Sequence, residues 1–190
     1  MNQTAATFLQ IDLQNLFYGA KNKGQRLDFE KVWAHFHERE TEFLTAAVVY
    51  LIRSVDFDSS KFEAKLKMVG YQIVTKNTDK VVRPYQSPYN KPVNHDIAIA
   101  VDCFDHITTF DKWVLMSGNG DFAPLCKYLR EKGKKVEIWG FRENHDSILD
   151  PYVDRIHYID ESFFFHKPRV TVFGFNNLED PQPPLEGHVD

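Results

Sequence analysis

Cysteine, excess basic charge and long apolar runs are all scarce in this sequence, and each scarcity excludes a class of protein. Two cysteines among 190 residues exclude a disulfide-stapled scaffold. Lys and Arg number 23 against 27 Asp and Glu, so any binding of nucleic acid must depend on a local basic patch. No apolar run approaches the roughly 18 residues of a membrane span, and no leader pattern opens the chain, so we expect a cytoplasmic protein without a membrane partner.

The composition that is present favours one globular domain. Hydrophobic residues make up 43% of the chain and aromatic residues 14%, which suffices for a substantial core. Both Cys103 and Cys126 fall on apolar stripes of predicted helices, and we interpret them as buried thiols in a reducing compartment. We expect the domain to cover residues 1–165. In the extension 166–190, residues 170–173 are strand-like and are expected to add to a sheet edge, and the acidic, proline-rich remainder is expected to be disordered.

Strand-like and helix-like segments alternate along the chain. Apolar residues follow helical spacing in the segments 29–36, 60–69, 97–104 and 122–129. Ser60 and Glu63 have the spacing of a capping box. Strands are expected over residues 7–13, 46–52, 71–75, 113–116, 136–138 and 156–159. This alternation predicts a three-layer, doubly wound α/β fold with a mainly parallel sheet.

Three aspartates are placed where such a fold collects its ligands, at the carboxyl ends of strands. Asp12 ends the first strand on what looks like its polar face, Asp121 follows the fourth strand, and Asp96 begins the helix before that strand. If the first and fourth strands are neighbours, the three carboxylates can form a cage for Mg²⁺ or Mn²⁺. Each also has a structural interpretation: Asp121 as the N-cap of its helix, Asp96 as a complement to a helix dipole, and Asp12 as a paired buried acid.

The turn Ser117-Gly-Asn-Gly-Asp121 supplies further polar candidates. Asn119 can offer a carbonyl oxygen to a metal where an acid would bind more strongly, and Ser117 is a candidate contact to the substrate. Asn15 follows Asp12 in a turn toward the same edge of the sheet. It either orients a phosphate or a water molecule, or simply forms the turn.

A long segment from Lys76 to Asn94 contains three prolines and is expected to be a loop. It interleaves cations with aromatic residues, as single-strand nucleic-acid grooves do. The alternative is a solvated loop whose charges are incidental. The substrate-binding candidates here are Lys76, Lys80, Arg83, Tyr85, Tyr89 and Lys91.

Other chemistries lack their motifs. No Walker loop, dinucleotide-binding glycine pattern or zinc-ligand spacing is present, so we expect no nucleotide cofactor. A phosphatase that works through an aspartyl phosphate is disfavoured, because Gln14 stands where the second aspartate of that motif would fall.

Four stretches of the chain together resemble the NYN domains of the PIN-like nuclease superfamily, and within it the bacterial LabA-like proteins. They are IDLQNLFYG at 11–19, DIAIAVD at 96–102, WVLMSGNGDFAPLCKYLREKGKKVEIWGF at 113–141 and DRIHYID at 154–160. The resemblance implies a PIN-like fold and Mg²⁺- or Mn²⁺-dependent cleavage of RNA. It implies metal-site roles for Asp12, Asp96 and Asp121 and a supporting polar role for Asn15. The chain departs from the family pattern at Asn119, where an aspartate is usual.

Two functions follow as expectations. The first is a metal-dependent ribonuclease acting on single-stranded or structured RNA, with catalytic roles for Asp12, Asn15, Asp96 and Asp121. The alternative is a regulatory protein that binds RNA or a protein partner and has lost catalytic strength through Asn119. A homodimer is a further expectation.

Overall fold

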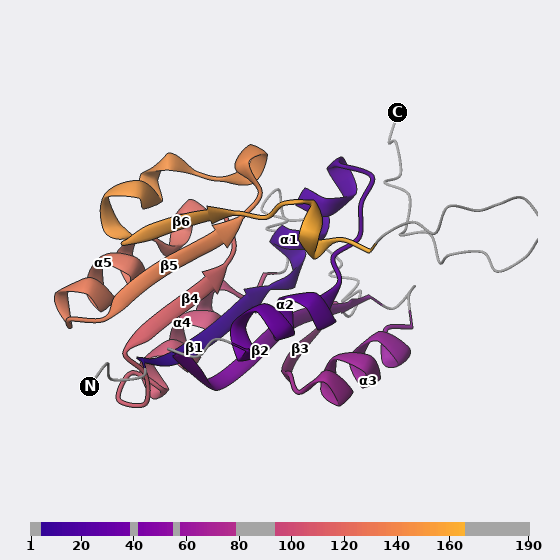
Figure 1. The fold of residues 1–190 in the computed structure, drawn as a ribbon, viewed down its shortest axis with the longest axis horizontal. Coiled ribbons are helices and arrows are strands. Elements are labelled where there is room, and N and C mark those ends of the chain that lie inside the picture. Colours follow the sequence, from indigo (N-terminus) through magenta and orange to yellow (C-terminus); the bar gives the residue numbers. More distant parts are fainter. Residues whose placement is uncertain (1–4, 39–41, 55–57, 79–93, 166–190) are drawn as a thin grey trace, which may run out of the picture.

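The computed structural model describes residues 5–38, 42–54, 58–78 and 94–165. In this part of the chain all strand pairs are parallel, in the order β3-β2-β1-β4-β5-β6 (Figure 1). The predicted three-layer α/β fold is confirmed, and β1 and β4 are neighbours at the point where the winding reverses. The strands are β1 (Ala5–Asp12), β2 (Glu42–Ser54), β3 (Gln72–Thr78), β4 (Lys112–Met116), β5 (Lys135–Gly140) and β6 (Arg155–Tyr158).

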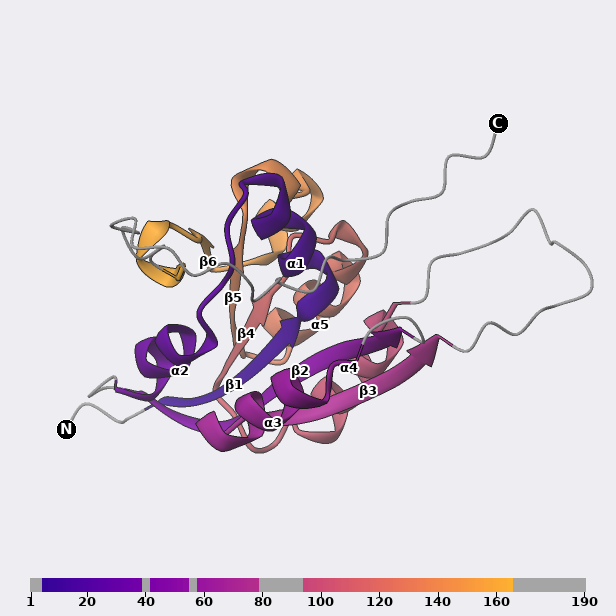
Figure 2. The ribbon, with the colours of Figure 1, turned by 90° about the vertical axis from the view of Figure 1, so that its right-hand side faces the viewer.

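Helices cover both faces of the sheet (Figure 2). Apolar residues of the first three helices pack in one core cluster, and those of the last two pack in a second cluster on the opposite face. The α-helices are α1 (Leu13–Asn22), α2 (Phe29–His37), α3 (Ser60–Val69), α4 (Asp96–Asp105) and α5 (Ala123–Glu131). Short 3₁₀ helices are η1 (Gly120–Phe122), η2 (Arg142–Asn144), η3 (Ser147–Tyr152) and η4 (Glu161–Phe163).

Helix α1 is the element that the sequence patterns did not predict. The first strand was expected to continue to Leu13, but the strand ends at Asp12, and Leu13 begins the helix. Asp12 is the N-cap, because its side chain accepts a hydrogen bond from the backbone amide of Asn15. Gly19 allows the helix to lie against Phe141, since a Cβ at this position would be 2.1 Å from that ring.

Strand β1 has no solvated face, contrary to the prediction that its second face is polar. Gln10 is fully buried on that face and accepts a 2.7 Å hydrogen bond from the indole N–H of Trp113. Its amide nitrogen donates to the hydroxyl of Tyr50 and, at 3.1 Å, to the carbonyl of Ile99 in α4. A buried amide with all these partners incurs little desolvation penalty, so the strand tolerates it. Gln10 therefore ties α4 to the centre of the sheet.

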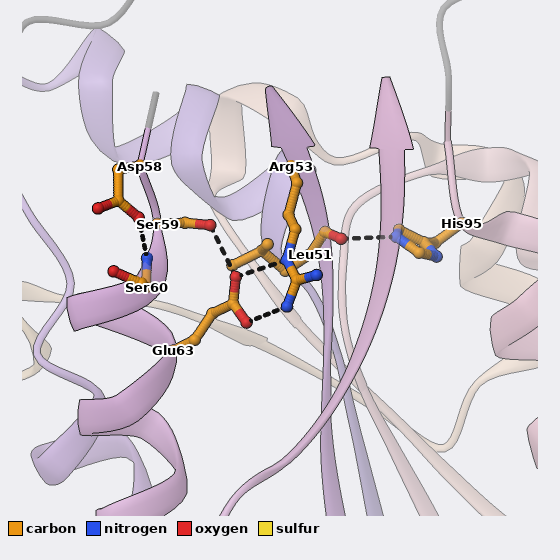
Figure 3. A network of polar contacts seen from close by, with 7 residues as sticks. All are labelled: Leu51, Arg53, Asp58, Ser59, Ser60, Glu63 and His95. Carbon is orange, nitrogen blue, oxygen red and sulfur yellow. Dashed lines mark hydrogen bonds and ion pairs between the residues drawn. The ribbon is translucent and has the colours of Figure 1, made fainter. Parts of the chain in front are cut away.

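The start of α3 also differs from the prediction. Ser59, not Ser60, is the N-cap, and it makes no side-chain capping bond, so the predicted capping box does not form. Glu63 instead accepts two hydrogen bonds from the Arg53 guanidinium, at 2.8 and 2.6 Å, and one from Ser59 (Figure 3). The Arg53 hydrogen bonds lower the pKa of Glu63 from 4.5 to about 2, against the opposing effect of burial.

The acid stability of the protein should depend on this pair. A carboxylate with a lowered pKa stabilises the fold at pH above about 4.5, and this contribution is lost as the pH falls toward about 2. Glu63→Gln should therefore lower the free energy of unfolding at pH 7 by about 1 kcal/mol, since Arg53 is half exposed and water screens the pair. It should also flatten the pH dependence of stability in this window, measured by urea unfolding.

A matched control is Glu131→Gln, which removes an exposed carboxylate 3.9 Å from Lys127. We expect its stability profile to follow that of the wild type. A Glu63→Gln profile as steep as the wild-type profile between pH 4.5 and 2 would contradict the role of the pair.

The structure also bears on the expectations for the cysteines and for membrane-spanning helices. Cys103 and Cys126 are free and fully buried, as predicted, and burial raises the pKa of Cys126 to about 12. In the part of the chain that the structure describes, no helix is long and apolar enough to cross a membrane. The predicted strand at 170–173 and the acidic tail lie outside the described residues.

Candidate functional site at the sheet switch point

Asp12 stands at the carboxyl end of β1, directly beside the end of β4. The pairing of Ile11 with Met116 brings Ser117 next to it, and the Ser117 hydroxyl donates to the Asp12 carboxylate at 3.0 Å. The backbone amide of Asn15 donates to the other carboxylate oxygen at 3.2 Å. Burial raises the pKa of Asp12, these two hydrogen bonds lower it, and the charge of Asp96 raises it further.

Asp96 reaches the same edge from the start of α4, as predicted. The preceding residue, His95, is buried, and its Nε2 donates to the Leu51 carbonyl of β2 at 3.0 Å, which anchors the start of the helix to the sheet (Figure 3). The side-chain nitrogen of Asn94 donates to the Asp96 carboxylate at 2.6 Å. Burial raises the pKa of Asp96, and the charge of Asp121 adds to this rise. The charge of Asp96 therefore interacts with the charges of both Asp12 and Asp121.

Asn119 caps the turn after β4, a role that was predicted for Asp121. Its side-chain oxygen accepts a hydrogen bond from the Asp121 amide at 3.1 Å, and its backbone amide donates to Ser117 at 3.2 Å. Its side-chain nitrogen donates to the Asp96 carboxylate at 3.3 Å. In this conformation the side-chain N–H of Asn119, rather than the side-chain oxygen, faces Asp96.

Asn15 and Ser117 connect the two strand ends. The Asn15 side-chain oxygen accepts from the Gly118 amide at 3.0 Å, so this residue joins the start of α1 to the turn after β4. Ser117 is fully buried, and its hydroxyl donates to the Asp12 carboxylate and accepts from the backbone amide of Asn119. A buried hydroxyl has no surface to offer a substrate, so its predicted substrate contact is corrected to the positioning of Asp12.

These residues surround a hollow of about 490 Å³, here called the switch-point hollow, whose size is that of a small-ligand site. Its acids are Asp12, Asp96 and Asp146. Its side-chain amides are Gln14, Asn15, Asn94, Asn119 and Asn144. Tyr18, Gly118 and Gly120 complete the lining.

Asp121 contributes to a different surface. It lines a neighbouring hollow of about 410 Å³ together with Lys127 and Tyr152 of α5 and η3. Gly120 borders both hollows, and Asp121 still acts on Asp96 through its charge. The structure therefore brings Asp12, Asp96, Asn15 and Asn119 together in the switch-point hollow, with Asp121 outside its lining.

The predicted substrate-binding loop falls mostly outside the described residues. Lys80, Arg83, Tyr85, Tyr89 and Lys91 all lie in the segment 79–93, and nothing in the structure bears on them. Lys76 belongs to β3, which runs to Thr78, and not to a loop as predicted. Its ammonium group donates to the Asn94 carbonyl at 3.2 Å, close to Asp96 in the chain.

Several residues of the hollow were not among the predicted ones. Gln14 and Tyr18 come from α1, which was itself missed, and Asn144 and Asp146 follow β5. Because β5 pairs with β4, residues after both strands meet at one edge, and this neighbour rule could have pointed to Asp146. A Cβ on residue 120 would lie 2.4 Å from the Asp146 carboxylate, so a larger residue there would require this side chain to move.

The donor chemistry of the hollow suits a hard cation. Apart from the Tyr18 hydroxyl, its polar side chains offer carboxylate and amide groups, and oxygen ligands are those that Mg²⁺ and Mn²⁺ prefer. The mutual repulsion of Asp12 and Asp96 is what a bound cation would relieve. Within residues 5–38, 42–54, 58–78 and 94–165, however, no three His, Cys, Asp or Glu side chains are grouped closely enough to hold a metal ion by themselves.

Comparison with known proteins identifies the family of this chain. A family model described as NYN domain matches residues 6–160. The low amplitude and bright protein LabA of Synechococcus elongatus is 30% identical over 133 residues, which cover 67% of this chain and 69% of that protein. A crystal structure of a protein of unknown function from Vibrio parahaemolyticus has a TM-score of 0.72 at 22% identity, covering 87% of this chain and 99% of the other.

The family match extends over all six strands and contains Asp12, Asp96, Asn119 and Asp121. The structural likeness to the Vibrio protein supports the fold. The chain therefore belongs to the NYN domain family, a member of the PIN-like nuclease superfamily.

Proposed function

We propose that this protein is a ribonuclease that hydrolyses RNA phosphodiester bonds with the help of Mg²⁺ or Mn²⁺. The observation that supports this most directly is the pairing of Asp12 with Asp96 at the switch-point hollow, where each carboxylate has a raised pKa. Ligands of doubly wound folds bind at this place. The membership of the NYN family, in a superfamily of nucleases, points to RNA as the substrate.

Asp12 and Asp96 would hold the metal ion, with Asp121 or the oxygen of Asn119 as further ligands. A bound Mg²⁺ or Mn²⁺ supplies a polarised water molecule and neutralises charge on the phosphate. For Asn119 to contribute its oxygen, the side chain has to turn from the arrangement in which its N–H faces Asp96. Asp146 lines the same hollow and adds to its negative potential.

The neighbouring residues fix the position of these acids. Ser117 and the Asn15 backbone hold the two oxygens of Asp12, so that its orientation is set before the substrate arrives. Asn15 also holds the turn after β4 through Gly118, and its side-chain N–H is the group that we propose to orient the phosphate or the attacking water. The loop cations Lys80, Arg83 and Lys91, with Tyr85 and Tyr89, stay candidates for contacts to the RNA chain, as does Lys76.

Replacing either paired acid should remove cleavage. Loss of an indirect partner of a metal ligand typically costs 10- to 100-fold in activity, so Asp12→Asn or Asp96→Asn should cost at least about 100-fold. The measurement is the rate of cleavage of mixed-sequence RNA with millimolar Mn²⁺, with EDTA as the metal-free reference. Asp105→Asn, at the exposed far end of α4, is the matched control and should keep wild-type activity.

The controls make the assignment falsifiable. If Asp12→Asn and the wild type cleave at the same rate, the activity comes from a contaminant, and the ribonuclease proposal fails. Circular dichroism and thermal unfolding of each variant show whether the fold is kept.

A second function is favoured by one observation, the amide of Asn119 at a position where the resemblance to NYN domains implies an aspartate. A hollow with one charge fewer binds cations more weakly, and the protein would then act by binding RNA or a protein partner without cleaving RNA. Titration with Mn²⁺ by calorimetry separates the two functions: heat of binding at or below millimolar metal supports the ribonuclease, and its absence supports the binding protein.

A further inference from the structure

One aromatic ring borders the switch-point hollow in the part of the chain that the structure describes, and it belongs to Tyr18. The side chain lies on α1 and is 47% exposed. The ring of Phe17 meets it edge-on, with centroids 5.6 Å apart and planes at 73°, which supports it from one side. A half-exposed, supported ring at the mouth of a polar hollow is the geometry of a stacking surface.

The position of Tyr18 follows from the helical repeat of α1. Gln14 lies four residues before it and Asn15 three, so all three side chains lie on the face of the helix that turns toward the hollow. Tyr18 is about 9 Å along the helix from the N-cap Asp12. This separation is on the scale of one nucleotide, so a phosphate near Asp12 and a base near Tyr18 can belong to the same strand.

The rest of the lining also fits a base better than a bare phosphate. Within the described residues the hollow has no lysine or arginine in its lining. The side chains of Gln14 and Asn144 line it, and they make no hydrogen bond to other described residues. Such amides pair with the edges of bases, which present both donors and acceptors.

We propose that Tyr18 binds RNA by stacking on an unpaired nucleobase next to the phosphate that a cation at Asp12 and Asp96 would bind, with Gln14 and Asn144 contacting the edge of that base. The inference rests on the proposed function for the identity of the substrate. It narrows that substrate to single-stranded RNA, because a base in a duplex is stacked on its neighbours and cannot lie against Tyr18.

The experiment compares two short ligands of equal length, oligoadenosine and an abasic sugar-phosphate chain, by fluorescence anisotropy with the full chain, with Ca²⁺ in place of Mn²⁺ as the oxygen-binding cation at the two acids. Tyr18→Ala should weaken oligoadenosine binding by about 5- to 150-fold and leave the abasic affinity unchanged. Tyr18→Phe keeps the ring and should bind both as the wild type does. Tyr128→Ala is the matched control, since this partly exposed tyrosine packs on Phe104 of α4 and does not line the hollow.

The outcomes separate this inference from the ribonuclease proposal. The stacking role is overturned if Tyr18→Ala binds oligoadenosine as tightly as the wild type, or if the substitution lowers the affinities for both ligands equally. This holds whether or not the wild type cleaves RNA. If base-dependent binding is lost in Tyr18→Ala but the wild type shows no Mn²⁺-dependent cleavage, the stacking role stands and the ribonuclease proposal fails. Unchanged melting temperatures show that the variants are folded.

Discussion

Replacing Asn119 with aspartate should tighten Mn²⁺ binding by about tenfold or more and raise the rate of RNA cleavage. Aspartate and asparagine have nearly the same shape, and the new side chain can still accept the Asp121 amide that caps η1. What changes is the charge beside Asp96, because the N–H that now faces this acid at 3.3 Å becomes a carboxylate oxygen. Two unit charges about 4 Å apart near a protein surface interact by several kcal/mol. A tenfold gain in Mn²⁺ affinity corresponds to only part of this energy.

The same substitution should destabilise the protein when no metal is present. It removes the hydrogen bond from Asn119 to Asp96 and sets two carboxylates against each other. We expect the free energy of unfolding in EDTA to fall by about 1 to 2 kcal/mol, and Mn²⁺ to restore it. Calorimetric titration gives the metal affinity, and urea unfolding with and without Mn²⁺ gives the stability.

Asn22→Asp is the matched control, since it adds the same charge at the exposed far end of α1. It should leave metal affinity unchanged and lower the metal-free stability by well under about 1 kcal/mol, the cost of an acid at an exposed helix C-terminus, and Mn²⁺ should not restore this loss. If Asn119→Asp behaves like this control while Asp121→Asn abolishes metal binding, residue 119 does not contact the metal, and the turn works as it stands.

Replacing Gly118 with alanine should disrupt the site through the backbone. A Cβ at this position would lie 2.3 Å from the carbonyl oxygen of Asn144, and a backbone atom cannot move aside as a flexible side chain can. The Gly118 amide donates to Asn15 and its carbonyl accepts from Asp146, so any shift loosens both sides of the hollow. We expect a loss of about 1 to 3 kcal/mol in the free energy of unfolding and a large drop in metal affinity.

Gly140→Ala serves as the comparison, because it adds a methyl group close by at little steric cost. The atoms nearest to a Cβ on residue 140 are 3.5 Å away or more, in ordinary van der Waals contact. Thermal unfolding and Mn²⁺ titration of the two variants, side by side, test the argument. Equal melting temperatures for both would show that the turn and the segment after β5 can separate without cost.

Local patterns were reliable where the structure depends on neighbours in the chain. The apolar run 46–52 lies within β2, and the helical spacing of residues 29–36 matches α2. Asp12 and Asp96 could be predicted at one edge of the sheet because a strand end and a helix start are local features. Patterns did not predict α1, whose first turn carries no acid and whose Gly19 weakens the helical signal but is required by Phe141.

The amino-acid sequence by itself determined the α/β class, the alternation of strands and helices, and two of the acids that meet at the switch point. Only the tertiary structure decided that Gln10 is buried, that Asn119 rather than Asp121 caps the turn, and that Tyr18 and Asp146 share the hollow. The physical reason is distance along the chain. Hydrophobic periodicity is a property of residues that are close together in the sequence. The partners that orient the site are far apart instead, such as Ser117 with Asp12, 105 residues away, and Asn15 with Gly118, 103 residues away.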